Sequence, residues 1–118
     1  MNRPPQIGSY AFGRIEIDGQ PYTSDVIVLP TGVRPDWWRK QGHHLDPDDL
    51  SAVFEASPKV LVIGQGAHGI MQVAEETRAA LKQAGIEAIC VPTGRAVDVY
   101  NERRDRGEAV AAALHLTC

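Results

Sequence analysis

A glycine-rich segment is the part of this sequence whose residue types and spacing come closest to a chemical motif. Gly64-Gln65-Gly66-Ala67-His68-Gly69 has the spacing of a dinucleotide-binding fingerprint, in which glycines let a backbone turn approach a pyrophosphate at a helix N-terminus. The segment directly follows residues 60–63, an apolar run that is typical of a buried strand. The fingerprint also requires a helix that begins at the turn and an acidic residue at the end of the next strand.

Neither of these two features follows the turn. The clear helical pattern begins near Ala74, after an extended or looped stretch at residues 70–73, and Val91-Pro92-Thr93 stands where the acid is needed. One β-helix-β unit in a chain of 118 residues also leaves little room for the second half of a dinucleotide site. The sequence therefore disfavours nicotinamide and flavin, and we expect no cofactor.

Two interpretations of the glycines stay open. In the first, they only let a central strand turn sharply at the edge of the sheet. In the second, the turn lies beside the start of the next helix, and both offer backbone N–H groups, a hydroxyl and a helix dipole to a small anion or metabolite. The candidate ligand-binding residues are then Gly64, Gln65, Gly66, Thr93, Gly94 and Arg95. The structural alternative makes Thr93 a helix cap and Arg95 a solvent-facing side chain.

The sequence contains no recognisable catalytic or metal-binding constellation. Cys90 falls in a predicted buried strand, where a thiol is usually inert, and Cys118 is a terminal residue, whose geometry is hard to fix. No serine lies in a Gly-x-Ser-x-Gly elbow. His43, His44 and Asp46 lack further ligands at a recognisable spacing. We therefore expect no catalytic residue and no metal, and we disfavour an enzyme without excluding one.

Trp37 and Trp38 are candidate interface residues. They lie among charged residues in residues 30–45, which Pro and Gly interrupt and which the sequence predicts to be a long loop of undetermined order. Aromatic side chains next to arginines are typical anchors of protein interfaces. We expect one tryptophan to pack on the core and the other to contact a partner protein or a second copy of the chain.

The elements that must position these residues are strands followed by alternating helices and strands. An Asp18-Gly19 turn predicts an N-terminal hairpin, and capping residues predict three helices. The predicted strands are residues 7–12, 14–17, 25–29, 60–63 and 86–91, and the predicted helices are residues 46–56, 74–84 and 93–106. Residues 109–117 fit a helix or a strand, and their alternating apolar positions favour a strand. This order predicts an α/β domain with a mixed sheet.

Composition narrows the class of protein. With 43% hydrophobic and 23% charged residues, the 118 residues suffice for one globular domain with one core. A formal net charge of -3 with interspersed basic residues argues against nucleic-acid binding. No apolar run predicts membrane insertion or export, and the spacing of the two cysteines favours a reducing cytoplasm.

Several segments, in this order and spacing, resemble the Mth938-like domain family. They are residues 7–15, 22–25 and 62–66, then Thr93, Ala96, Tyr100-Asn101 and residues 115–118. The resemblance covers almost the full chain and implies one domain over residues 1–118. The implied fold is three-layered, with a central mixed β-sheet, flanking helices and an N-terminal β-hairpin or meander. It also favours a strand at the C-terminal end and makes Asn101 either a packing residue or a further ligand contact.

The family's relatives include an adipogenesis-associated protein and a mitochondrial complex I assembly factor, and the resemblance carries no catalytic residues. The leading hypothesis is therefore a non-enzymatic binding or assembly-factor-type protein. The alternative is a small-molecule or anion-binding protein, or an undetected enzyme, that uses the turns at Gly64–Gly66 and Thr93. The expected partners are a protein, a second copy of the chain or a small anion.

Overall fold

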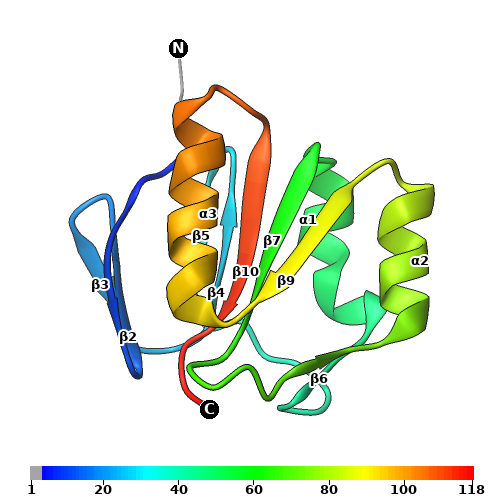
Figure 1. Ribbon diagram of the computed structural model, residues 1–118, viewed down its shortest axis with the longest axis horizontal. Helices are drawn as coiled ribbons and strands as arrows, with labels where there is room; N and C mark the ends of the chain where they lie inside the picture. The colour runs from blue at the N-terminus through cyan, green and yellow to red at the C-terminus, as the bar shows by residue number, and fades with distance from the viewer. Residues whose placement is uncertain (1–3) are drawn as a thin grey trace.

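The chain folds into three layers around a five-stranded sheet. The computed structural model describes residues 4–118. Figure 1 shows helix α3 and the N-terminal strands on one side of the sheet and helices α1 and α2 on the other. In the order β5-β4-β10-β7-β9, the sheet contains β5 (Gly32–Arg34), β4 (Val26–Leu29), β10 (Val110–His115), β7 (Val60–Gln65) and β9 (Glu87–Val91).

The sheet is mixed because its two halves have different pairings. β10 runs parallel to β7, with Ala112 opposite Val62, and antiparallel to β4, with the same Ala112 opposite Val28. β9 is parallel to β7, and β5 is antiparallel to β4. All of β4 and β10 is buried, as expected for strands covered on both faces. The expected mixed sheet is confirmed, and so is the strand at the C-terminal end.

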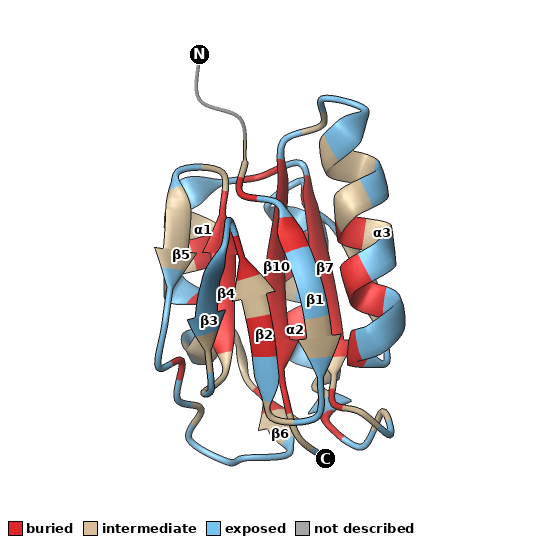
Figure 2. Ribbon diagram, turned by 90° about the vertical axis from the view of Figure 1, so that its left-hand side faces the viewer, coloured by how far each residue is buried: buried red, intermediate tan, exposed pale blue. Residues whose placement is uncertain are grey.

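A three-stranded antiparallel meander covers one face of the sheet together with α3 (Figure 2). It consists of β1 (Ile7–Ala11), β2 (Arg14–Ile17) and β3 (Gln20–Tyr22). Asp18 and Gly19 form the β2–β3 turn with φ of 48° and 80°, which explains the Asp-Gly pair there. Along β2, Ile15 and Ile17 are buried while Arg14 is exposed, so the alternation in the sequence marks the inner face of the meander.

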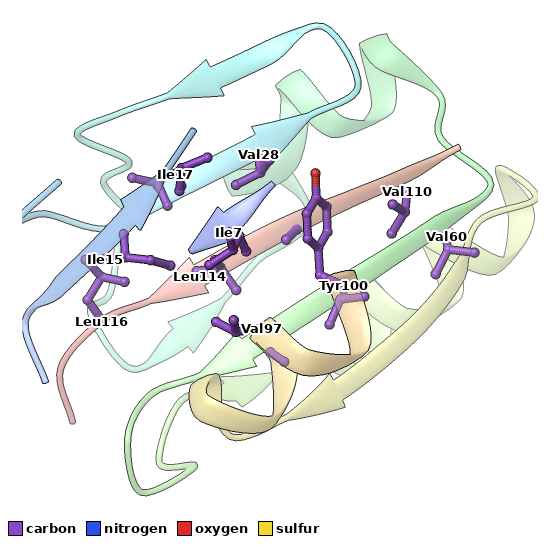
Figure 3. Packing of buried hydrophobic residues seen from close by; sticks show 14 residues of the cluster. Ile7, Ile15, Ile17, Val28, Val60, Val97, Tyr100, Val110, Leu114 and Leu116 are labelled. Carbon is purple, nitrogen blue, oxygen red and sulfur yellow. The ribbon is translucent and has the colours of Figure 1, made fainter. Parts of the chain in front are cut away.

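The first hydrophobic core lies between the sheet, the meander and α3 (Thr93–Asp105). In Figure 3, Tyr100 and Val97 of α3 point toward Ile7 of the meander and Leu114 of the sheet. The buried Tyr100 hydroxyl donates a hydrogen bond to the carbonyl of Pro5 at 2.6 Å. The second core lies on the opposite face, under 3-10 helix η1 (Pro47–Leu50), α1 (Ser51–Ala56) and α2 (Glu75–Gln83).

The structure corrects the expectation that residues 30–45 form one long loop. Two short strands lie within it, β5 and β6 (His44–Leu45), and β6 pairs with β8 (Gln72–Val73). The helix expected over residues 46–56 is two pieces, because its first turn is the 3-10 helix η1. The other expected strands and helices are present with ends shifted by one or two residues. Within residues 4–118, no helix is both long and apolar enough to cross a membrane.

Asn101 attaches α3 to the meander. Its Oδ1 accepts the Ile7 N–H at 3.1 Å, and its Nδ2 donates to the Ile7 carbonyl at 2.8 Å. The side-chain amide therefore takes the place of a neighbouring strand for this residue of β1. We predict that Asn101→Ala lowers the free energy of unfolding by about 1–3 kcal/mol, because two partly buried backbone groups lose their partner.

Urea unfolding followed by circular dichroism measures this change, with Asp98→Ala as control because Asp98 is an exposed position on the same helix. Equal stability of the two variants would contradict a structural role for Asn101.

Candidate functional site

The turn after β7 and the start of α3 lie side by side, as the sequence analysis expected. The Gly66 N–H donates to Thr93 Oγ1 at 2.9 Å, and the Thr93 N–H donates to the Gly66 carbonyl at 3.0 Å. The Thr93 hydroxyl donates in turn to the His115 carbonyl at 2.6 Å. Pro92 is the N-cap of α3 and Thr93 is its first residue, and the Thr93 hydroxyl is bonded to Gly66 and His115, so the alternative that Thr93 caps the helix is wrong. It joins β7, α3 and β10.

The chain's own C-terminal segment packs against the glycine turn. A Cβ added at Gly66 would lie 2.6 Å from the carbonyl oxygen of Cys118 and 2.9 Å from Cδ2 of His115. Gly66 also has φ of +96°, which side chains rarely adopt. The next donor, the Ala67 N–H, is bonded to the Thr117 carbonyl at 2.7 Å. Glycine is therefore required here by the close approach of the tail.

Of the remaining candidate ligand residues, Gly64 and Gln65 belong to the turn and Gly94 directly follows Thr93. The Gln65 side chain donates to the Met71 carbonyl at 2.9 Å and closes its own loop. Gly94 and Arg95 are exposed on the first turn of α3, and Asn101 lies farther along that helix, bonded to β1. Ligand binding by Gly64, Gln65, Gly66, Thr93, Gly94, Arg95 and Asn101 stays a prediction.

A polar cluster that the sequence analysis did not identify lies at the C-terminal end of β10. Asp25 precedes β4, Arg39 follows the two tryptophans, and His115 is the last residue of β10. Asp25 Oδ2 lies 2.8 Å from Arg39 Nη2 and 2.8 Å from His115 Nδ1, while Asp25 Oδ1 accepts the Leu116 N–H at 2.7 Å. Three separate groups thus meet on one carboxylate.

The Asp25 carboxylate is held in its ionised form. Burial alone would raise its pKa, but the hydrogen bonds from His115, the Leu116 N–H and Arg39 outweigh burial and lower the pKa below its ordinary value. An ionised carboxylate only accepts hydrogen bonds, so the proton between Asp25 and His115 is assigned to Nδ1 of the imidazole. Arg39 Nη2 also lies 3.0 Å from Nδ1, and with this assignment it donates to Asp25 and not to the imidazole.

Arg39 is fixed on three sides. Its Nη2 is paired with Asp25, its Nε donates to the Gly42 carbonyl at 3.0 Å, and its Cζ lies 4.7 Å from the centre of the Trp37 ring. Its side chain is only 4% exposed. Two nitrogen atoms of the cluster, Arg39 Nη1 and His115 Nε2, are buried and have no hydrogen-bond partner among residues 4–118.

The two tryptophans have opposite environments. Trp37 is buried, and its Nε1 donates to the Asp49 carbonyl at 2.8 Å, whereas Trp38 is 79% exposed. Both line a cavity of about 320 Å³ that reaches Asp25, Arg39 and His115. They also line a second cavity of about 330 Å³, next to α1. Contact of Trp38 with a partner stays a prediction.

Cys90 and the adjacent residues His43 and His44 lie in environments that limit their reactivity. Cys90 is half-buried rather than fully buried, and burial raises the pKa of its thiol above the ordinary value, so it is a poor nucleophile at neutral pH. His44 Nε2 lies 3.3 Å from Asp46 Oδ1, while His43 contacts the His115 ring edge-on at 5.6 Å. Within residues 4–118, no group of three or more His, Cys, Asp or Glu side chains could hold a metal ion.

Comparison with known proteins assigns this fold to a family. The model of a family described as protein of unknown function (DUF498/DUF598) matches residues 7–115. The chain belongs to the DUF498/DUF598 family. This family description names no ligand, reaction or partner, and no match was found among curated proteins.

Solved structures similar to this DUF498/DUF598 member confirm the Mth938-like fold. An outer membrane protein from Bartonella henselae has 27% identity and a TM-score of 0.86, with 99% of this chain and 98% of that chain covered. The protein MT938 has 30% identity and a TM-score of 0.80, with 97% and 99% covered. A Mth938-like domain from Bordetella pertussis has 21% identity and a TM-score of 0.69, with 95% and 85% covered.

The close approach at Gly66 predicts opposite outcomes for alanine at two glycines. Gly66→Ala should destabilise the DUF498/DUF598 domain by more than about 2 kcal/mol, because the added Cβ meets backbone atoms and φ is positive. Gly94→Ala should be neutral or stabilise by up to about 1 kcal/mol, because Gly94 is helical and has open space around it. Thermal unfolding of both variants checks the pair. Similar melting temperatures would contradict this account of the turn.

The lowered pKa of Asp25 predicts the pH dependence of stability. The carboxylate contributes stability above its ordinary pKa of 3.8, and this contribution is lost as the pH falls through the lower pKa of the folded state. At neutral pH, Asp25→Asn should lower the free energy of unfolding by roughly 3–5 kcal/mol, since it leaves Arg39 buried without its counter-charge. The difference from wild type should shrink below about pH 4.

Urea unfolding from neutral pH to about pH 2.5 measures the effect, with the exposed Asp98→Asn as control. A stability gap between wild type and Asp25→Asn that stays constant over this range would refute the paired carboxylate.

Proposed function

We propose that this Mth938-like domain is a non-enzymatic, assembly-factor-type binding protein whose partner docks around Trp38. The observation that carries the proposal is the 79% exposure of this tryptophan. Tryptophan is enriched among the residues that dominate binding energy at interfaces, because it buries a large area with few rotatable bonds. In the same proposal, the protein acts in the cytoplasm, as the cysteine content suggests.

The residues on both sides of Trp38 are held in place, Trp37 by its backbone and indole and Arg39 by its side chain, which supports a preformed docking surface. The Trp37 N–H donates to the Asp25 carbonyl at 2.8 Å, and the Trp37 indole is bonded to Asp49. Arg39 is held by Asp25 and Gly42. A partner that contacts Trp38 therefore meets neighbouring side chains that are already ordered, which lowers the entropic cost of binding.

The charge beside Trp38 favours a basic partner segment. The neighbouring cavity next to α1 is lined by Asp36, Asp48 and Asp49 and by one cation, Arg34. Asp48 is paired at 3.0 Å with Lys40, and both of these side chains are largely exposed. A lysine or arginine of a partner could stack on the Trp38 ring and lie near these carboxylates. We therefore propose a partner protein with a basic side chain at the centre of its interface.

The internal bonding of the Asp25 cluster supports binding rather than catalysis. Asp25 directs its oxygens to Arg39, His115 and the Leu116 N–H, which fixes the loop and the tail in place. These contacts give the carboxylate a positioning role beneath the docking surface.

A photo-crosslinking amino acid at position 38 tests the docking site in the source cells. Its matched control is position 12, because Phe12 is 62% exposed and lines neither cavity. We expect a protein crosslinked at position 38 only, through a peptide that contains lysine or arginine. The purified partner should bind Trp38→Ala at least about tenfold more weakly than Phe12→Ala, and Asp36→Asn/Asp48→Asn should also weaken it.

Crosslinking only to a second copy of this chain would mean that Trp38 lies in a homo-oligomer interface and not in an interface with another protein. Identical products from positions 12 and 38 would refute docking at Trp38.

A further inference from the structure

The Asp25–Arg39–His115 cluster contains more hydrogen-bonding capacity than the chain itself uses. The Arg39 side chain is 4% exposed and that of His115 is 7% exposed, yet Arg39 Nη1 and His115 Nε2 have no partner within residues 4–118. A guanidinium nitrogen only donates, and leaving a buried donor unpaired is costly. An acceptor from outside the chain would remove this cost.

A cavity lies beside these two residues. It has a volume of about 320 Å³ and runs between the residues before β4, the Trp37–Arg39 segment and the end of β10. This is much larger than one water molecule, which occupies about 30 Å³, and is at the lower end of the range of about 300–1,000 Å³ for small-molecule sites. Trp37 and Trp38 form apolar walls, while Ser24, Asp25, Arg39 and His115 form the polar part.

We propose that this cavity binds a small organic carboxylate with an apolar body. The carboxylate would accept hydrogen bonds from Nη1 of Arg39, which is the one permanent cation among the described residues that line the cavity, and the apolar body would lie between Trp37 and Trp38. Because Asp25 already neutralises Arg39, the anion needs a second positive charge nearby. Protonation of His115 would supply it, with Nδ1–H on Asp25 and a new N–H at Nε2.

The proposal includes uptake of a proton on binding. The groups that face His115 are Asp25, Arg39 and His43, and the Cys118 Sγ lies 3.8 Å from Nε2 of His43. An added anion favours the charged imidazole over the neutral one. Binding should therefore be tighter at mildly acidic pH than at alkaline pH.

Access to the two nitrogen atoms requires movement of a side chain. Each has less than 1 Å² of accessible area, so a ligand reaches them only when the lining of the cavity adjusts. Trp38 is the cavity-lining aromatic side chain with room to move, because it is 79% exposed whereas Trp37 is buried and hydrogen-bonded. The Trp38 indole therefore also serves as a spectroscopic reporter.

Titration with benzoate, followed by NMR of the two indole N–H signals and the His115 ring, tests the proposal without any protein partner. Benzamide is the neutral probe of the same shape, and inorganic phosphate is the anion without an apolar body. We expect saturable shifts with benzoate, with a dissociation constant at least about tenfold lower than for benzamide or phosphate. Saturable binding of phosphate as tight as that of benzoate would overturn the organic carboxylate.

Arg39→Lys keeps the positive charge but loses the forked guanidinium, and it should bind benzoate at least about tenfold more weakly than wild type. The matched control is Arg34→Lys, because Arg34 is exposed and lines the other cavity. Wild-type affinity in Arg39→Lys would overturn the site.

A measurement on the wild-type protein covers the case in which Arg39→Lys does not fold. Calorimetric titration of benzoate at neutral pH, in buffers of different ionisation enthalpy, should show net proton uptake on binding. Absence of proton uptake, or absence of saturable benzoate binding, would overturn the proposal. Neither result depends on whether a protein docks at Trp38.

Discussion

The position of the C-terminal end of this fold depends on the carboxylate of Asp25. Its side-chain oxygens bind the Arg39 guanidinium, the His115 imidazole and the Leu116 N–H, and its backbone carbonyl accepts the Trp37 N–H. A buried charge is tolerated when several hydrogen bonds replace the lost water, and here those bonds come from the loop after β5, from the last residue of β10 and from the tail that follows it. One side chain thereby fixes two segments that no regular strand pairing holds.

The glycine turn follows from the same constraint. Asp25 holds the Leu116 N–H and the Ala67 N–H holds the Thr117 carbonyl, so the tail lies beside the turn after β7 and the carbonyl of Cys118 occupies the space that a Cβ at Gly66 would need. Thr93 closes the arrangement, since its hydroxyl bridges the Gly66 N–H and the His115 carbonyl. The fingerprint-like spacing of the glycines is thus explained by contacts within the chain, and the polar groups with unused hydrogen bonds lie elsewhere, on Arg39 and His115.

Local sequence patterns predicted the sheet and helices because each pattern depends on which residues of that one element are buried. The apolar runs at β4, β7 and β10 and the Asp-Gly turn are of this kind. The site was missed because Asp25 and His115 lie 90 residues apart, so no local pattern joins them, although each stands in a segment that resembles the family. Short strands β5 and β6 were also missed, since Gly32 and the surrounding prolines mask their pairing. In a segment without regular secondary structure, the sequence also does not determine which of two adjacent tryptophans is buried.

Trp37 and Trp38 have opposite environments because the residues on both sides of Trp38, but not Trp38 itself, are bonded to the rest of the fold. Trp37 is drawn inward by its bond to the Asp49 carbonyl and by the Arg39 guanidinium on its ring. The Arg39 side chain is held by Asp25, so both neighbours of Trp38 are bonded to the rest of the fold while Trp38 itself stays exposed. Trp38 is therefore exposed because both of its neighbours bond to the rest of the fold, and not because the loop lacks contacts. Because Trp38 lines both cavities, whatever fills one of them contacts the side chain that bounds the other.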